Sequence, residues 1–199
     1  MTRILVVGAH PDDPEFGAGG LIQSYEERMA LILTLGSRGG GAAARETEAY
    51  AAAKVLRLTL ELHQLPDTRL DVRDAIEPIE AAVRRFAPDV VATCSGADVH
   101  QDHLAVHHAT LIATRDFTGT VLAYMTPSAA EKFRPNWFIA LDKDDMRVKL
   151  EAIHCHDSQR TRSYMSDAHI LSMGTYWAMI NRMQAPFAEP FELVRHREE

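Results

Sequence analysis

Short apolar runs alternate with longer segments of mixed polarity along most of the chain. Runs with the length and apolar content of strands occur at residues 4–7, 30–35, 60–65, 90–94, 121–125 and 137–141. Apolar residues recur at helical spacing at residues 21–29, 42–58, 71–86, 103–117, 142–156 and 173–183. Strands that alternate with helices through short loops predict an α/β fold, in which helices cover both faces of a mostly parallel sheet.

Proline and capping residues refine these predicted boundaries. Pro78 lies inside the segment 71–86 and removes a helical hydrogen bond, so this segment is expected to kink or to divide into two helical pieces. Asp142 is a natural N-cap for the helix that follows it. Beyond the last predicted helix, Pro186 and Pro190 predict an irregular tail.

The composition is that of an ordinary globular protein with a mildly acidic surface. The chain has 199 residues and no internal linker or repeat, so we expect one domain over residues 1–199. A net charge of -7 without any basic tract argues against non-specific binding to nucleic acid. No signal-peptide pattern is present, and no apolar run approaches the roughly 18 residues of a membrane span. We therefore expect a cytoplasmic protein without a membrane partner, with Cys94 and Cys155 as free thiols.

Polar side chains directly follow the first predicted strand. His10, Asp12 and Asp13 lie beyond its carboxyl end, which is where open α/β sheets bind their ligands. Histidine and aspartate suit zinc, although Asp12 or Asp13 could instead only cap the next helix. The glycines within 17–20 are expected to form tight turns before that helix begins. Their spacing differs from the GxGxxG phosphate-binding pattern, and two carboxylates would repel a phosphate.

A second polar loop follows the predicted strand at 90–94. It contains His100, Asp102 and His103, and both histidines can approach one face of the helix that starts there. Because parallel strands bring both loops to the same edge of the sheet, two His/Asp clusters favour a shared site more strongly than either cluster alone. The alternative is a non-catalytic module on the same frame that binds a metal or a nucleotide.

Other polar residues have structural interpretations as well. His154, Cys155 and His156 are adjacent, but successive helical residues point about 100° apart, so the three are not expected to hold one ion together. Arg45 and Glu48 could form only a surface ion pair, worth under about 1 kcal/mol.

Motifs along most of the chain resemble those of the LmbE-like, or PIG-L, zinc-dependent N-deacetylases. GAHPDDPEFGAGG at 8–20 resembles the family's AHPDD signature, and HQDH at 100–103 resembles its HPDH motif. The further similarities, in the family's order, are RETE at 45–48, LPDTRL at 65–70, PDVV at 88–91, KLEAIHCHDSQ at 149–159 and APFAEPFEL at 185–193. The resemblance implies a Rossmann-like three-layer α/β sandwich with a mostly parallel central sheet.

The resemblance also implies a metal centre and its general base. His10, Asp13 and His103 match the family's zinc ligands, and Asp12 matches the general base. Zn²⁺ is therefore the expected cofactor, with Fe²⁺ as an alternative for the same type of donors.

Four further residues match functional positions of the family. His100 matches the histidine that stabilises the oxyanion, and Asp102 matches a carboxylate that supports a histidine. Arg45 matches an arginine that contacts substrate in several members, and His156 lies in a late motif near the site.

The implied reaction is hydrolysis of an N-acyl group on an amino sugar, such as an N-acetylglucosamine conjugate. Water made acidic by the zinc would give its proton to Asp12, and a protonated His100 would stabilise the tetrahedral oxyanion. A non-sugar N-acyl substrate is the alternative, because Ser37 and Arg38 stand where the family often has a Gly-Glu type of loop beside the pocket. The resemblance further implies a homo-oligomer, either a trimer or a hexamer.

Overall fold

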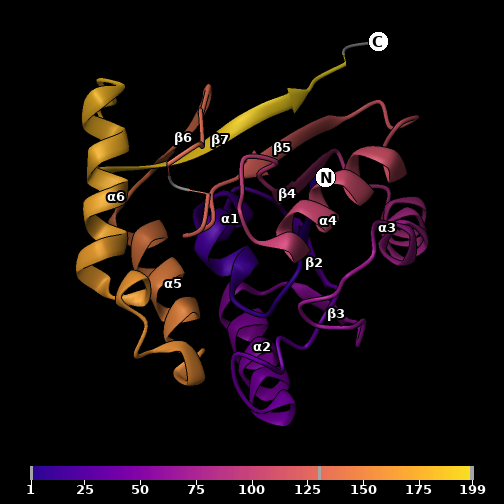
Figure 1. Cartoon of the computed structure of the whole chain (residues 1–199). Helices are drawn as coiled ribbons and strands as arrows, with labels where there is room; N and C mark the ends of the chain where they lie inside the picture. Colours follow the sequence, from indigo (N-terminus) through magenta and orange to yellow (C-terminus); the bar gives the residue numbers. More distant parts are fainter. Residues whose placement is uncertain (1, 130, 198–199) are drawn as a thin grey trace.

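A seven-stranded sheet forms the centre of the computed structural model, which describes residues 2–129 and 131–197. The strand order is β3-β2-β1-β4-β5-β7-β6, and β7 runs antiparallel to both of its neighbours whereas the other pairs are parallel. The strands are β1 (Arg3–Gly8), β2 (Glu27–Ile32), β3 (Thr59–Leu62), β4 (Val90–Cys94), β5 (Thr120–Tyr124), β6 (Trp137–Leu141) and β7 (Phe187–Arg195). Figure 1 shows the strands crossing the middle of the molecule.

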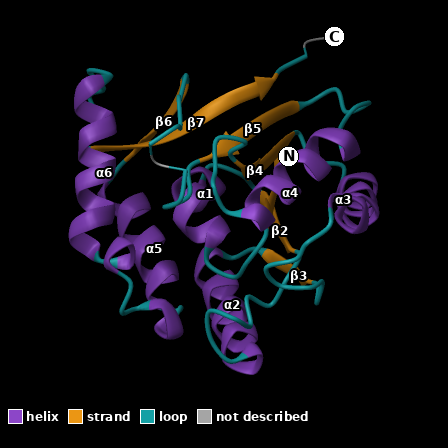
Figure 2. Cartoon of the chain, in the orientation of Figure 1, coloured by secondary structure: helices purple, strands orange, loops and turns teal. Residues whose placement is uncertain are grey.

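Helices cover both faces of this sheet, as the alternating pattern predicts (Figure 2). One group is α3 packed on α4, and the other is α1 packed on α2 and α5, with α6 against β7. The helices are α1 (Asp13–Gln23), α2 (Ala42–Leu56), α3 (Val72–Phe86), α4 (Gln101–Ala113), α5 (Lys143–His154) and α6 (Asp167–Ile180), with short 3₁₀ turns η1 (Asp157–Gln159) and η2 (Ser163–Met165) between α5 and α6. The prediction of a mostly parallel α/β sandwich is confirmed.

The central strands are buried on both faces. Every side chain of β1 from Ile4 to Val7 is fully buried, and β4 beside it is buried along its length. A parallel strand between two layers of helices needs apolar residues at each position, which explains the continuous apolar runs in the sequence.

The glycines after β1 lie inside a helix, so the prediction of tight turns before a helix at 21–29 was wrong. α1 already begins at Asp13 and ends at Gln23. A Cβ atom on Gly17 would lie 2.1 Å from Cδ2 of Tyr124, and one on Gly20 would lie 2.4 Å from Cδ1 of Leu141. These glycines let α1 pack closely on neighbouring side chains, and this distant packing outweighs their low intrinsic helix propensity.

The C-terminal region forms a strand where the prolines predicted an irregular tail. β7 lies between β5 and β6, and Pro190 pairs with Phe138 of β6. The strand forms because both of its partners are supplied by distant parts of the chain, which a local pattern does not reveal. α6 likewise begins at Asp167, before the predicted start at residue 173.

The capping predictions fared better than the expected helix break. Asp142 caps α5 in a reciprocal capping box with Asp145. α3 is one helix with Pro78 inside it, not two pieces, and Ile79 on its buried face packs into the core.

Cys94 and Cys155 are free thiols. Within the described ranges, no helix combines the length and the apolar character needed to cross a membrane.

Candidate active site

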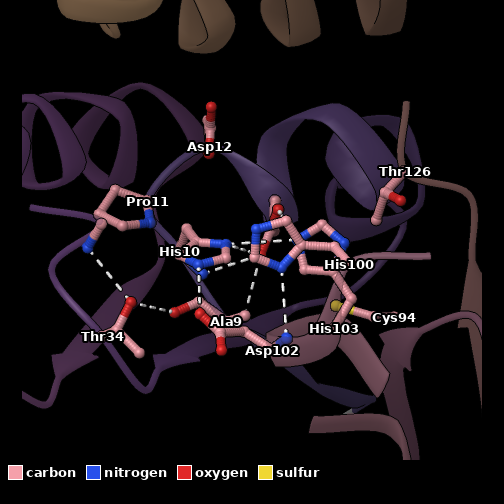
Figure 3. A network of polar contacts seen from close by, with 12 residues as sticks. Ala9, His10, Pro11, Asp12, Thr34, Cys94, His100, Asp102, His103 and Thr126 are labelled. Atoms are coloured by element: carbon pink, nitrogen blue, oxygen red, sulfur yellow. Dashed lines mark hydrogen bonds and ion pairs between the residues drawn. The ribbon is translucent and has the colours of Figure 1, made fainter. Parts of the chain in front are cut away.

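The two polar loops predicted from the sequence meet at the carboxyl edge of the sheet. β1 and β4 are parallel neighbours, so the loop after β1 lies beside the loop after β4. Figure 3 shows His10 of the first loop facing His100, Asp102 and His103 of the second. The rings of His10 and His103 have centroids 5.2 Å apart, and those of His100 and His103 are stacked at 4.6 Å.

Three residues of this cluster, His10, Asp13 and His103, bring donor atoms close enough to share one metal ion. His10 Nδ1 lies 3.3 Å from His103 Nε2, and Asp13 Oδ1 lies 3.3 Å from the same nitrogen. Asp13 Oδ2 lies 3.6 Å from His10 Nδ1. Zinc bonds of about 2.0–2.1 Å in a tetrahedral arrangement place donor atoms about 3.3 Å apart, so the donor set suits this ion. His100 also has a ring nitrogen within 4.8 Å of donor atoms of His10 and His103.

In both His10 and His103, a carboxylate contacts the ring nitrogen that is not in the donor set. Asp102 Oδ2 lies 3.0 Å from His10 Nε2, and Asp98 Oδ2 lies 2.8 Å from His103 Nδ1. Asp13 is fixed as well, because its Oδ2 accepts backbone N–H groups of Ala9 and His10 at 2.9 and 2.8 Å. Carboxylates in this position orient a metal-binding imidazole and select its tautomer.

Two carboxylates that contact the histidines of the donor set were not predicted from the sequence. Asp98 lies in the loop after β4, and Asp67 lies after β3 with Oδ1 3.4 Å from His10 Nε2. Both follow the carboxyl end of a parallel strand, the same signal that identified the two predicted loops. Their roles depend on which way the side chains point, and the sequence pattern does not give that direction.

The carboxylates make the cluster strongly attractive to positive charge. Burial lowers the pKa of His10, but hydrogen bonds to Asp102, Asp13 and Asp67 raise it well above its ordinary value. Burial likewise opposes the charge on His103, while Asp13 and Asp98 raise its pKa to about 9. The same carboxylates would favour a metal cation, which takes the place of the imidazole protons.

Asp12 stands apart from the donor set. It is the N-cap residue of α1 with φ of 99°, a conformation that few non-glycine residues adopt, and its side chain makes no capping hydrogen bond. In Figure 3 it points away from the histidines. Its Oδ1 lies 3.2 Å from Nη2 of Arg45. Burial raises the pKa of the Asp12 carboxyl above its ordinary value, and the charge of Arg45 opposes that rise.

A cavity of about 380 Å³ opens over these groups. His10, Asp12, Asp13, Arg45, His100 and His103 all line it, so six of the eight predicted site residues are brought together. The remaining wall comes from α1, from the loops after β2, β3 and β5 and from the segment after α5, and includes Phe16, Arg38, Asp67, Ser128, Gln159, Arg162 and Tyr164.

The other two predicted residues lie behind the cavity wall. Asp102 is fully buried and also accepts the backbone N–H groups of Thr68 and Leu70. His156 is 1% exposed, and its Nε2 lies 3.5 Å from Oε2 of Glu15 in the first turn of α1. The structure therefore places His156 against α1 rather than on the surface of the cavity.

Fold and site together define an α/β protein with a His/Asp metal-type centre at the carboxyl edge of its sheet. Residues 5–114 match the family model PIG-L, described as GlcNAc-PI de-N-acetylase. The chain belongs to the PIG-L family.

Similarity to individual proteins supports the assignment to the PIG-L family. The uncharacterized deacetylase YaiS of Escherichia coli (strain K12) is 36% identical over 168 residues, which span 78% of this chain and 90% of YaiS. The diacetylchitobiose deacetylase of Thermococcus kodakarensis is 26% identical over 80% of this chain and 70% of its own length. The fold is shared with the conserved protein TT1542 from Thermus thermophilus, with a TM-score of 0.86, 24% identity and coverage of 100% of this chain and 97% of that one.

Proposed function

We propose that this protein is a metal-dependent N-deacetylase that removes the acetyl group from an acetamido sugar. The observation that carries the proposal is the cavity in which His10, Asp13 and His103 form a metal-type donor set, with the carboxylate of Asp12 beside this set and not part of it. The deacetylase names of YaiS and of the Thermococcus kodakarensis protein support the reaction, and the second name supports an N-acetylated sugar as substrate. Zinc is the proposed ion, and iron(II) would suit the same donors.

The metal and Asp12 have complementary roles in this proposal. When bound, the ion supplies Lewis-acid chemistry, which acidifies water and polarises an acyl oxygen. Asp12 accepts the proton of the attacking water and later gives it to the leaving amine. Burial favours this role because it raises the pKa of the carboxyl towards the working range of a general base, while Arg45 fixes its direction.

His100 supplies a hydrogen bond to the developing oxyanion. Its Nδ1 accepts the backbone N–H of Asp102 at 3.2 Å, so the neutral ring carries its proton on Nε2. Burial lowers the pKa of His100, which favours the neutral ring. We therefore assign a neutral His100 that donates from Nε2, in place of the protonated ring expected from the sequence. Loss of such a donor typically slows turnover by about 10²–10³-fold.

Arg45 orients the base and faces the substrate. Its Nη2 donates to the carbonyl of Pro11 at 2.5 Å and to Asp12. Nε and Nη1 are buried and find no hydrogen-bond partner among the described residues. Because protein atoms cover these two donors, we propose that Arg45 acts on the substrate through its charge and holds Asp12 through Nη2.

Metal content and acetate release test the proposal together. Purified protein is assayed with N-acetylglucosamine and diacetylchitobiose, with and without a chelator. We expect Asp12→Asn to retain metal and to lose about 10²–10⁴-fold in turnover, because a general base contributes that much. His103→Ala is expected to lose the metal. The control is Asp116→Asn, whose exposed side chain lies far outside the cavity lining and whose loss should leave both readouts unchanged.

Each alternative predicts a different result. Full activity in Asp12→Asn would exclude this residue as the base. A protein that holds no metal and releases no acetate from any acetamido sugar would favour a non-catalytic binding module. Amine release without acetate would indicate hydrolysis of a different acyl group.

A further inference from the structure

Two arginines on the cavity wall have no part in the mechanism proposed above. Arg38 lies in the loop between β2 and α2, and Arg162 lies between η1 and η2. Both side chains line the cavity that contains Asp12 and His100. No carboxylate within residues 2–129 and 131–197 forms an ion pair with either guanidinium group. They therefore present two positive charges to whatever enters the cavity.

Hydrogen bonds hold the backbone around each arginine, whereas no described residue forms a hydrogen bond or an ion pair with its guanidinium group. The backbone N–H of Arg38 donates to Asp67 Oδ2 at 2.6 Å. The other oxygen of Asp67 faces His10 of the donor set. The backbone N–H of Arg162 donates to the carbonyl of Gln159 at 2.9 Å. The backbone end of each side chain is thus held in place, while its guanidinium group is left for a ligand.

The same wall is held together across the two segments. Nε2 of Gln159 donates to the carbonyl of Gly39 at 2.9 Å, which joins η1 to the loop that carries Arg38. Ser158 in turn donates from its backbone N–H and from its hydroxyl to the two oxygens of Glu48 on α2, both at 2.7 Å. Segments that are more than 100 residues apart in sequence therefore form one wall with an arginine on each part.

The lining of the cavity carries both negative and positive charges. The donor set and Asp12 supply carboxylates, beside which a metal and the amide bond would lie. Arg38 and Arg162 supply positive charge to the same lining, and the buried Arg45 adds N–H groups that have no partner among the described residues. Because the whole chain carries a net charge of -7, it repels anions at long range, and only such local groups can favour them.

We propose that the substrate carries an anionic group, a carboxylate or a phosphate, outside its acetamido group, and that Arg38 and Arg162 bind that group. This inference rests on the proposed deacetylase function and specifies its class of substrate. The planar guanidinium group matches both anions, because each can accept two parallel N–H hydrogen bonds. Diacetylchitobiose and free N-acetylglucosamine, which are neutral, would then be poorer substrates.

Matched neutral and anionic substrates test the inference. Acetate release is measured with N-acetylglucosamine, with its 1-phosphate and 6-phosphate, and with a glycoside whose aglycone is glycolate. The phosphate and glycolate arms distinguish the two sources of negative charge. We expect kcat/KM to be at least about 10-fold higher for one anionic substrate than for the neutral sugar, a typical effect of charge-assisted hydrogen bonds. Added salt is expected to reduce this preference, because the arginines are partly in water.

Substitutions assign the preference to particular side chains. Arg38→Gln and Arg162→Gln are each expected to lower the ratio of anionic to neutral kcat/KM by about 5-fold or more, and Arg38→Lys is expected to restore part of it. Arg160→Gln is the matched control. Arg160 lies two residues from Arg162, is 72% exposed, pairs with Asp157 and does not line the cavity, so its loss should leave the ratio unchanged.

The outcomes separate this inference from the proposed function. Equal kcat/KM for neutral and anionic sugars, or equal losses on both kinds of substrate in the two glutamine variants, would overturn the inference and leave the deacetylase intact. If no acetamido sugar releases acetate, the proposed function fails. Calorimetric titration then decides the inference separately: N-acetylglucosamine 1-phosphate must bind the metal-loaded protein more tightly than N-acetylglucosamine, and the two glutamine variants must lose that difference.

Discussion

At the scale of single residues, carboxylates outside the donor set decide how the histidines are presented. Asp98 accepts from His103 Nδ1 and also from the hydroxyl groups of Thr126 and Ser128. It is buried, and although burial works against its charge, His103, the backbone N–H of His100 and the hydroxyl of Ser128 lower its pKa to about 2. Asp98 is therefore charged across the physiological range and holds the ring of His103 in one orientation.

Removal of this carboxylate should weaken metal binding without removing a metal ligand. We expect Asp98→Ala to lower the affinity for zinc by about 10–100-fold, as losses of such outer partners usually do. Competition against a chromophoric chelator measures the change, with Asp116→Ala as the exposed control. An unchanged affinity in a variant with native circular dichroism would show that Asp98 does not support the metal site.

At the scale of elements, a buried ion pair fixes α1, the helix that follows the cavity-lining loop after β1. Lys149 of α5 donates from Nζ to Oε1 of Glu189 on β7 and to the carbonyl of Phe16 on α1, each at 2.6 Å. Glu189 also accepts the backbone N–H groups of Gly20 and Leu21 at 2.7 Å. Two elements from distant parts of the sequence, α5 and β7, thus converge on α1, directly after the residues that face the cavity.

Substitution of Lys149 should lower the free energy of unfolding much more than substitution of Arg147, a surface arginine on the same helix. Lys149→Met leaves the carboxylate of Glu189 buried without a counter-charge, and we expect the free energy of unfolding to fall by about 3–5 kcal/mol. Urea unfolding measures this change. The matched control is Arg147→Ala, which breaks the exposed pair with Glu151 and should cost under about 1 kcal/mol. Similar losses in the two variants would contradict a structural role for the buried pair.

At the scale of the whole molecule, a bound metal would connect two halves of the fold. Its proposed ligands come from the β1–α1 junction and from the start of α4, which are about 90 residues apart in sequence. Ligand binding to the folded state alone stabilises a protein by about 2.7 kcal/mol at 100 times Kd. For a chain of this size, that stabilisation corresponds to a rise in Tm of about 5–10 °C.

Thermal unfolding with and without zinc tests this connection. We expect the rise in Tm in the wild-type protein and in Asp12→Asn, and no rise in His103→Ala. A chelator should reverse it. The same rise in His103→Ala would place the zinc elsewhere.

The expected trimer or hexamer stays a prediction, which sedimentation equilibrium can test.

Much of the candidate site could be predicted because the pattern that indicates it lies within short stretches of the sequence. His10, Asp13 and His103 follow apolar runs that end at one edge of the sheet, and their side-chain chemistry is that of metal ligands. Asp98 follows the same kind of strand but was missed, because a single aspartate in a loop equally often serves as a turn or cap residue. The direction in which a loop side chain points depends on neighbours outside the loop.

The sequence by itself determined where strands alternate with helices and which two loops bring histidine and aspartate side chains to one edge of the sheet, because apolar periodicity and motif spacing are properties of neighbouring residues. Only the tertiary structure decided that α1 incorporates its glycines, that β7 forms between β5 and β6, and that His100 presents Nε2. It also decided that Arg38 and Arg162 share one cavity wall. Each of these features depends on contacts between segments that are far apart in the chain, and no local pattern encodes such contacts.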